Sequence, residues 1–229
     1  ASVASHCVVF SLGSDTGGSI RQPASHCNLV GLKPTYGTVS RYGLIALGSS
    51  LDQIGPLTQT VTDAEIAYTA LATHDKREST SVPFSLRTQH YMPLKKKIGV
   101  PFHFFENGGV QKEIMEGFNT VLEGLKLSGY EIVPISLDYI HYSLPVYYII
   151  QPAEASSNLA RFDGIRYGMS EKNESLLDVY MKTRGNGFGK EVRRRIITGT
   201  YVLSHGYYDA YYGKALIMKE QIRDELKTI

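Results

Sequence analysis

A glycine-rich run that ends in a serine, Gly17-Gly18-Ser19, is the feature that most constrains how this chain folds. Glycine lets the backbone turn and approach another group closely, because it has no Cβ. Acyl transfer requires backbone N–H groups aimed at a developing oxyanion beside the nucleophile. We therefore predict Ser19 as a nucleophile, with Thr16, Gly17 and Gly18 supplying the N–H donors.

A plain glycine-rich turn and a phosphate-binding loop are the alternatives to this interpretation. The run from Gly13 to Ser19 lacks the Gly-Lys-Ser/Thr ending of a P-loop. The motif therefore does not predict an ATP site in this chain.

Ser19 needs a base, because a serine hydroxyl is a poor nucleophile at neutral pH. His6 and His26 lie near it in the sequence, but a Ser–His–Asp relay needs a placement that the sequence does not give. His6, in an apolar run, is predicted to be a core residue. Asp15 and Arg21 flank the loop, and we expect them to form a buried ion pair that braces it rather than to act as an acid and a base.

The composition is typical of a globular protein. Of 229 residues, 42% are hydrophobic and 20% are charged, which leaves enough apolar material for a large core. A net charge of +2 gives no electrostatic footprint for nucleic acid. Cys7 and Cys27 lack metal-binding spacing, which predicts free thiols, a reducing compartment and no metal site. No apolar stretch approaches the roughly 18 residues of a membrane span.

Strand-like and helix-like patterns alternate along the chain, which predicts an α/β fold with a mixed or parallel sheet. A capping box at Thr62–Glu65 is predicted to open a helix that reaches about Thr73, and Gly129 is predicted to close another helix. The patterns predict strands at 8–12, 97–100 and 131–135, helices at 62–73 and 110–125, and a mostly helical segment at 152–212 with a loop around 184–187.

Longer motifs follow the serine loop. They are Gly31-Leu32-Lys33-Pro34-Thr35-Tyr36-Gly37, Ser40-Arg41-Tyr42-Gly43, Leu51-Asp52-Gln53-Ile54-Gly55-Pro56, Glu154–Gly164 and Gly206–Tyr212. With the first three of these, residues 1–65 closely resemble the amidase signature family. The sequences of the second and third motifs are most similar to those of the family's tRNA-dependent amidotransferase A subunits. The resemblance extends, more loosely, over nearly the whole chain.

The resemblance implies an amidase signature fold, with a mixed, mostly parallel β-sheet core flanked by helices. It implies a single amidase domain over 1–229, with a signature core at about 1–65 and a helical substrate-side segment at about 150–215. Ser19 would belong to a Ser–cis-Ser–Lys triad whose other two members lie upstream of Ala1, and Thr16, Gly17 and Gly18 would form the oxyanion hole. We therefore expect a chain truncated at both ends and inactive by itself.

The resemblance also implies a site for the α-carboxylate and α-amino group of glutamine. A guanidinium suits a carboxylate, because its fork donates two parallel hydrogen bonds. By motif position, Arg195 is assigned to the carboxylate and Tyr147 to a supporting contact. Arg194 and Tyr148 are the neighbouring alternatives, and a surface arginine and a core tyrosine also stay open.

The implied function is glutamine hydrolysis, with ammonia passed to a partner. The implied partners are the amidotransferase B and C subunits of a heterotrimer that converts Glu-tRNA(Gln) or Asp-tRNA(Asn). Binding of tRNA occurs through the complex, which also uses ATP and Mg²⁺; no cofactor is expected in this chain. A stand-alone amidase of small amides and a non-catalytic scaffold are the alternative functions. The implied compartment is the bacterial cytoplasm or an organelle matrix.

Overall fold

The computed structural model describes residues 1–83, 96–106 and 109–229. The chain divides into two compact units, each made of two segments. The first unit comprises Ala1–Gln89 and Tyr147–Ala215, and the second comprises His90–Val146 and Leu216–Ile229. The serine loop lies in the first unit. The single amidase domain remains a prediction.

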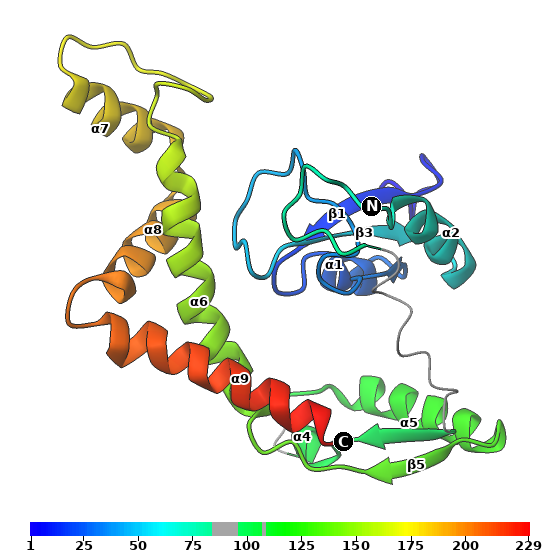
Figure 1. Cartoon of the computed structure of the whole chain (residues 1–229). Helices are drawn as coiled ribbons and strands as arrows, with labels where there is room; N and C mark the ends of the chain where they lie inside the picture. Colours follow the sequence, from blue (N-terminus) through cyan, green and yellow to red (C-terminus); the bar gives the residue numbers. More distant parts are fainter. Residues whose placement is uncertain (84–95, 107–108) are drawn as a thin grey trace. The chain divides into compact units, whose positions relative to one another are not determined.

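A three-stranded antiparallel sheet positions the serine loop in the first unit (Figure 1). Its strands are β1 (Ser11–Asp15), β2 (Val30–Gly31) and β3 (Gln53–Thr58), and β3 is the central strand. Helix α1 (Arg21–His26) packs against β2, and α2 (Val61–Leu71) packs against β3. The serine loop therefore leaves the sheet at the end of β1 and enters α1.

The first strand begins later than the apolar run predicted. Val8, Val9 and Phe10 are exposed and precede β1, so the predicted strand at 8–12 has the wrong bounds. Pairing begins where Ser11 faces Leu57 of β3 and continues to Asp15. A strand forms where a neighbour supplies matching N–H and C=O groups, and the apolar run does not specify that neighbour.

Helix α2 is capped by Thr60 rather than by Thr62. The Thr60 hydroxyl accepts a hydrogen bond from the N–H of Asp63 at 3.1 Å and donates to the Asp63 carboxylate at 2.7 Å. The predicted capping box is therefore two residues late. The spacing from Thr60 to Asp63 matches that of a capping box, with aspartate in place of glutamate. The helix ends at Leu71, just before the predicted end.

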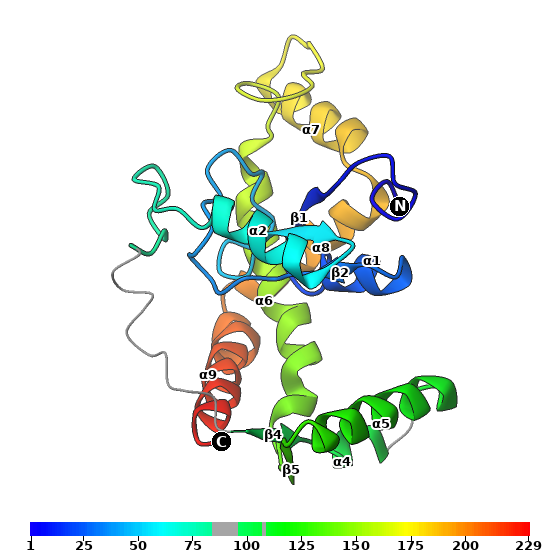
Figure 2. The same ribbon diagram turned by 90° about the vertical axis from the view of Figure 1, so that its right-hand side faces the viewer.

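In the second unit, β4 (Lys97–Val100) and β5 (Glu131–Pro134) form a parallel pair. Helices α4 (His103–Glu106) and α5 (Lys112–Leu127) connect them, and α5 packs against β5 (Figure 2). Gly129 closes α5 as predicted: with φ at 84°, its N–H donates to Lys126, and that of Tyr130 donates to Leu125. The predicted strand–helix–strand segment is confirmed.

The expected α/β class is confirmed, with both antiparallel and parallel strand pairs. Among the described strands, only β4 and β5 pair in parallel, so these strands are not mostly parallel. Parallel strands require a long crossover connection. The segment from Lys97 to Pro134 supplies such a connection with α5, whereas the strands of the first unit pair antiparallel.

The C-terminal part of the chain is mostly helical, as predicted. It contains α6 (Ser143–Asn158), α7 (Leu176–Gly187), α8 (Lys190–Leu203) and α9 (Lys214–Lys227), with short turns η1 (Ile140–Tyr142) and η2 (Leu159–Arg161) and a π-helix η3 (Tyr208–Gly213). The prediction of a loop around 184–187 is wrong, because α7 continues to Gly187. The Arg184 guanidinium donates to the carbonyl oxygens of Leu159 and Phe162, which anchors this last turn.

Candidate active site

Ser19 lies exposed on the loop between β1 and α1. Gly18 has φ at 147°, a conformation that favours glycine. Within the described part of the chain, the N–H groups of Gly17, Gly18 and Ser19 have no hydrogen-bond acceptor. Ile20, which follows, is completely buried and anchors the loop. The loop thus presents a hydroxyl beside free backbone donors, which is the arrangement that an acyl-transfer site requires.

The predicted ion pair braces the two ends of this loop, but only its carboxylate is buried. Arg21 contacts both carboxylate oxygens of Asp15 at 3.0 Å, and the N–H of Ile20 donates to the same carboxylate at 3.2 Å. The Asp15 side chain is fully buried, whereas that of Arg21 is half exposed. Burial alone would raise the pKa of Asp15, but the hydrogen bonds from Arg21 and Ile20 outweigh it and hold this pKa below its ordinary value.

Tyr147 of α6 lies against the same loop. A Cβ added at Gly17 would stand 2.8 Å from Cε2 and 3.2 Å from the hydroxyl oxygen of Tyr147. Tyr147 is half buried, whereas its neighbour Tyr148 is 57% exposed. The structure therefore brings Tyr147, and not Tyr148, to the loop that carries Ser19.

Arg195 of α8 is tied to the helix that carries Tyr147. Its guanidinium donates to Gln151 of α6 at 2.7 Å and to Glu191 at 2.9 Å. Burial lowers the pKa of Arg195, but hydrogen bonds with Glu191 and Tyr147 outweigh it and raise this pKa above its ordinary value. Arg194 is 74% exposed and pairs with Glu191. Of the two arginines, Arg195 is the one that contacts Tyr147. Its role in binding substrate stays a prediction.

Two residues of this arrangement were not singled out from the sequence. Gln151 is completely buried, and its Nε2 has no partner in the described structure. It lies four residues after Tyr147, and this helical spacing is the signal that links it to the site. The second is Asp52, which accepts a hydrogen bond from the Thr16 hydroxyl at 2.6 Å. Asp52 lies inside the motif Leu51–Pro56, and no role was predicted for it from the sequence.

Neither nearby histidine makes a hydrogen bond to Ser19 in the part of the chain that the structure describes. His6 is exposed, so its prediction as a core residue is wrong; its φ of 60° and its contact with Gln59 at 2.8 Å place it in a surface turn. Among the described residues, no group of three or more His, Cys, Asp or Glu side chains is arranged to hold a metal ion.

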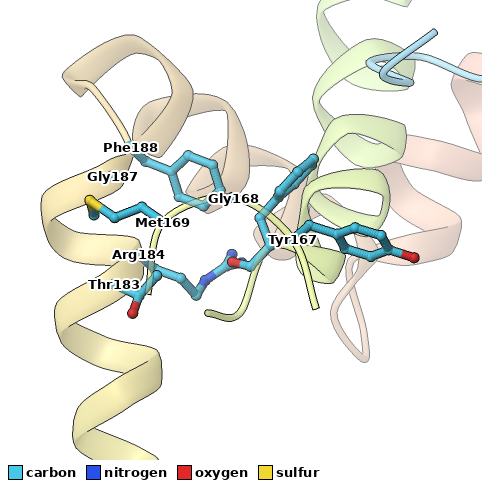
Figure 3. Close-up of a pocket in the computed structure, with 8 residues that line it drawn as sticks. Tyr167, Gly168, Met169, Thr183, Arg184, Gly187 and Phe188 are labelled. Carbon is cyan, nitrogen blue, oxygen red and sulfur yellow. The ribbon is translucent and has the colours of Figure 1, made fainter. Parts of the chain in front are cut away.

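A small cavity of about 130 Å³ lies elsewhere in the first unit (Figure 3). Its walls include Tyr167, Met169, Arg184 and Phe188, as the close-up shows. The Arg184 guanidinium stacks over the Phe188 ring at 5.0 Å and is engaged by backbone carbonyls. None of the candidate site residues lines this cavity, so it is separate from the serine loop.

A family model described as Amidase matches residues 1–229, and the chain therefore belongs to the amidase family. The resemblance that its motifs indicated is confirmed. The chain is 51% identical to the A subunit of glutamyl-tRNA(Gln) amidotransferase from Desulfatibacillum aliphaticivorans, over 99% of this chain and 48% of that protein. It is 53% identical to the protein of the same name from Caldanaerobacter subterraneus subsp. tengcongensis, over 99% of this chain and 47% of that protein.

A solved structure gives the same result. The crystal structure of the A subunit of glutamyl-tRNA(Gln) amidotransferase from Thermotoga maritima matches with a TM-score of 0.72 and 40% identity, over 99% of this chain and 45% of that chain. The chain thus spans about half the length of the curated relatives it matches. Among the described residues, no helix is both long and apolar enough to cross a bilayer.

Proposed function

We propose that this chain is part of the glutamine-hydrolysing A subunit of a tRNA-dependent amidotransferase. The observation that carries the proposal is the exposed Ser19 beside the N–H groups of Gly17 and Gly18, which have no acceptor among the described residues, with Tyr147 packed against the same loop. The names of the relatives at about 50% identity support the choice of this subunit within the family.

In the proposed reaction, the Ser19 oxygen attacks the side-chain carboxamide carbon of glutamine. The tetrahedral intermediate places its negative oxygen against the backbone N–H groups of the loop. The C–N bond then breaks, and the nitrogen takes the proton given up by Ser19 and leaves as ammonia. Water hydrolyses the resulting ester, which releases glutamate and restores the serine hydroxyl. The proton relay is assigned to the second serine and the lysine that the family places upstream of Ala1.

Substrate binding is assigned to Arg195 and Tyr147. The guanidinium would hold the α-carboxylate of glutamine by two hydrogen bonds, and Gln151 and Glu191 keep that guanidinium in place. This assignment gives the site a preference for an amide that carries a free carboxylate.

Ammonia from this reaction would pass to a larger B subunit, with a small C subunit joining the two. The B subunit would activate Glu-tRNA(Gln) or Asp-tRNA(Asn) with ATP and Mg²⁺. The proposed setting is the bacterial cytoplasm or an organelle matrix, and the bacterial source of the compared relatives supports the first.

The test is glutamine hydrolysis by the full-length protein, alone and co-expressed with its B and C subunits, with and without acyl-tRNA and ATP. The proposal predicts that the partners, tRNA and ATP stimulate ammonia release. Hydrolysis of small amides at a rate that does not depend on the partner subunits or tRNA would instead favour a stand-alone amidase. The 229-residue chain by itself is predicted to show no Ser19-dependent turnover.

A further inference from the structure

The Asp52 carboxylate is a buried junction beside the serine loop. Its residue is only 3% exposed. It accepts hydrogen bonds from the Thr16 hydroxyl at 2.6 Å, from the N–H of Leu47 at 2.9 Å and from the N–H of Gly48 at 3.1 Å. Neutral donors thus surround this carboxylate, and one of them belongs to the residue that opens the serine loop.

Helix α6 holds the segment that carries Asp52. The Glu154 carboxylate accepts a hydrogen bond from the N–H of Ser50 at 2.9 Å, and the Asn158 side chain donates to the carbonyl oxygen of Leu47 at 3.2 Å. The same helix carries Tyr147, which lies against Gly17. One rigid element therefore supports the serine loop both directly and through Asp52.

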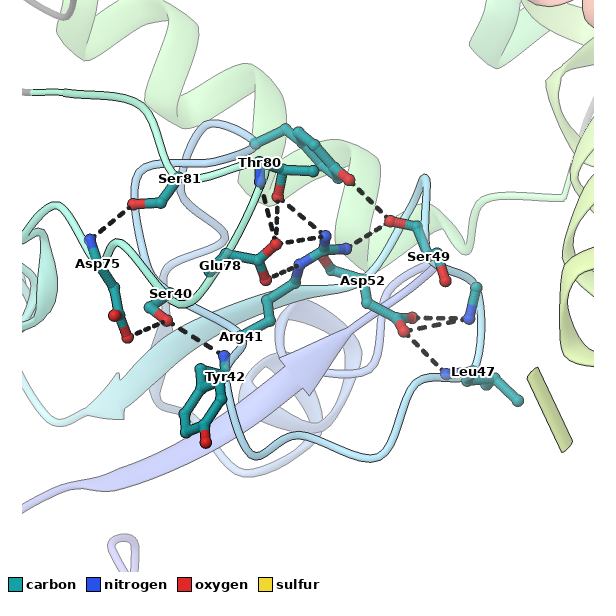
Figure 4. A network of polar contacts seen from close by, with 12 residues as sticks. Ser40, Arg41, Tyr42, Leu47, Ser49, Asp52, Asp75, Glu78, Thr80 and Ser81 are labelled. Atoms are coloured by element: carbon teal, nitrogen blue, oxygen red, sulfur yellow. Dashed lines mark hydrogen bonds and ion pairs between the residues drawn. The ribbon is translucent and has the colours of Figure 1, made fainter. Parts of the chain in front are cut away.

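Arg41 fixes the same segment from the other side (Figure 4). Its guanidinium donates to the carbonyl oxygens of Ser49 and Asp52, and it forms an ion pair with Glu78 at 3.1 Å. Arg41 and Glu78 are both largely buried. With its backbone held in this way, Asp52 forms a fixed anchor for Thr16.

We propose that Asp52 is a positioning residue that, through the Thr16 hydroxyl, aims the N–H groups of Gly17 and Gly18 at the acyl oxygen. This inference rests on the proposed function of Ser19. The backbone of Gly18 is not fixed by its own residue type, because glycine has access to more conformations than any other residue. A fixed contact on Thr16, which directly precedes Gly17, limits how far the N–H groups of Gly17 and Gly18 can rotate.

The carboxylate is suited to this task because it accepts several hydrogen bonds and donates none. In Asp52→Asn, one oxygen becomes an NH₂ group, which cannot accept a hydrogen bond from the N–H of Leu47 or Gly48. The side chain that contacts Thr16 is then no longer fixed in place, while its volume barely changes. Oxyanion stabilisation acts in the transition state, so its loss lowers kcat and leaves KM almost unchanged.

The experiment uses the full-length protein with its B and C subunits and measures glutamine hydrolysis. The variants are Asp52→Asn, Thr16→Val, the double variant and Thr16→Ser. We expect each of the first two to lower kcat about 10- to 100-fold, since removing an oxyanion donor costs about 100- to 1000-fold. KM should change less than about threefold. The double variant should be no worse than the poorer single variant, and Thr16→Ser, which keeps the hydroxyl, should recover most of the kcat that Thr16→Val loses.

Asp63→Asn is the matched control. It makes the same chemical change at an aspartate that also contacts a threonine hydroxyl, that of Thr60 at 2.7 Å, but at the cap of α2. Its kcat should equal that of the wild type. If Asp52→Asn does not fold, Thr16→Val tests the same hydrogen bond, because valine keeps the shape of threonine.

Three results would overturn the inference: unchanged kcat in a folded Thr16→Val or Asp52→Asn, losses that multiply in the double variant, or a rise in KM alone. Ser19→Ala is included to separate this inference from the proposed function. Turnover that needs Ser19 but ignores Asp52 and Thr16 would overturn the inference only, whereas turnover that survives Ser19→Ala would overturn the proposed function and the inference together.

Discussion

Gly17 and Tyr147 are 130 positions apart in the numbering, yet a side chain at Gly17 would occupy the space of the Tyr147 ring. Cε2 of Tyr147 lies only 2.8 Å from the position of an added Cβ. A Cβ at this position would therefore force the ring or the loop to shift, and the contact links the serine loop to α6. The loop that carries Ser19 therefore packs directly against Tyr147, the candidate substrate contact.

Gly17→Ala should displace either the Tyr147 ring or the loop, because an added Cβ would stand closer than 3.0 Å to the Tyr147 ring and one of the two must shift. We expect kcat/KM for glutamine to fall about 10- to 100-fold in the full-length complex. Steady-state kinetics measure this. Gly43→Ala is a positive-φ control outside the site, with nothing near its Cβ, and should leave kcat/KM near wild type. Wild-type kinetics in Gly17→Ala would show that the contact is not tight.

Arg195→Lys should raise KM for glutamine about 10- to 100-fold, because an ammonium cannot form the paired hydrogen bonds of a guanidinium. Arg194→Lys is the matched control on the adjacent residue, which is 74% exposed, and should leave KM unchanged. Kinetics with glutamine and with a small amide that lacks a carboxylate distinguish the two. Equal effects of both substitutions would remove Arg195 from the proposed site.

Gly199→Ala should disrupt the packing of α8 against α6. A Cβ there would overlap the Pro152 carbonyl oxygen, which is backbone and cannot rotate away. We expect a loss of about 3 kcal/mol or more of unfolding free energy, or failure to fold. Gly185→Ala, in α7 with no atom near its Cβ, should gain about 0.5–1 kcal/mol. Chemical denaturation of the full-length variants measures both, and a tolerated Gly199→Ala would contradict the close approach.

The Asp15–Arg21 pair predicts a specific pH dependence of stability. Because the pKa of Asp15 is lowered in the folded state, its contribution is fully present above the ordinary value of about 3.9 and is lost as pH falls through the lower, folded pKa. Asp15→Asn should cost about 1–3 kcal/mol at pH 7 and progressively less below about pH 4. Denaturation of wild type and variant from pH 7 to pH 3 tests this. A difference that stays constant down to pH 3 would contradict it.

Local sequence signals predicted those parts of the fold that local contacts determine. The end of α5 is set by Gly129 and by the backbone hydrogen bonds that Gly129 and Tyr130 donate, all within residues 125–130, and it was predicted correctly. The start of β1 depends on Leu57 of another strand, and the apolar run at 8–10 gave no information about it. The cap of α2 was misplaced because Thr60 and Thr62 both precede acidic residues at the same spacing.

The candidate site divides in the same way. Ser19 and its flanking glycines are adjacent in the sequence, so a single motif indicates them. The Asp15–Arg21 pair also lies within one motif. Asp52 and Gln151 were not assigned roles, because their partners Thr16 and Arg195 are brought to them only by the fold. A hydrogen bond between residues 36 or 44 positions apart leaves no periodicity in a single sequence.

The decisive measurement for the proposed nucleophile is ammonia release from glutamine by the full-length protein in complex with its partner subunits, with acyl-tRNA and ATP present. Wild type is compared with Ser19→Ala and with Ser25→Ala. Ser25 is an exposed residue of α1 whose hydroxyl donates to the Gln22 carbonyl oxygen. We predict that Ser19→Ala abolishes ammonia release and that Ser25→Ala retains it. Ammonia release that persists in Ser19→Ala would contradict the assignment of the nucleophile and, with it, the proposed function.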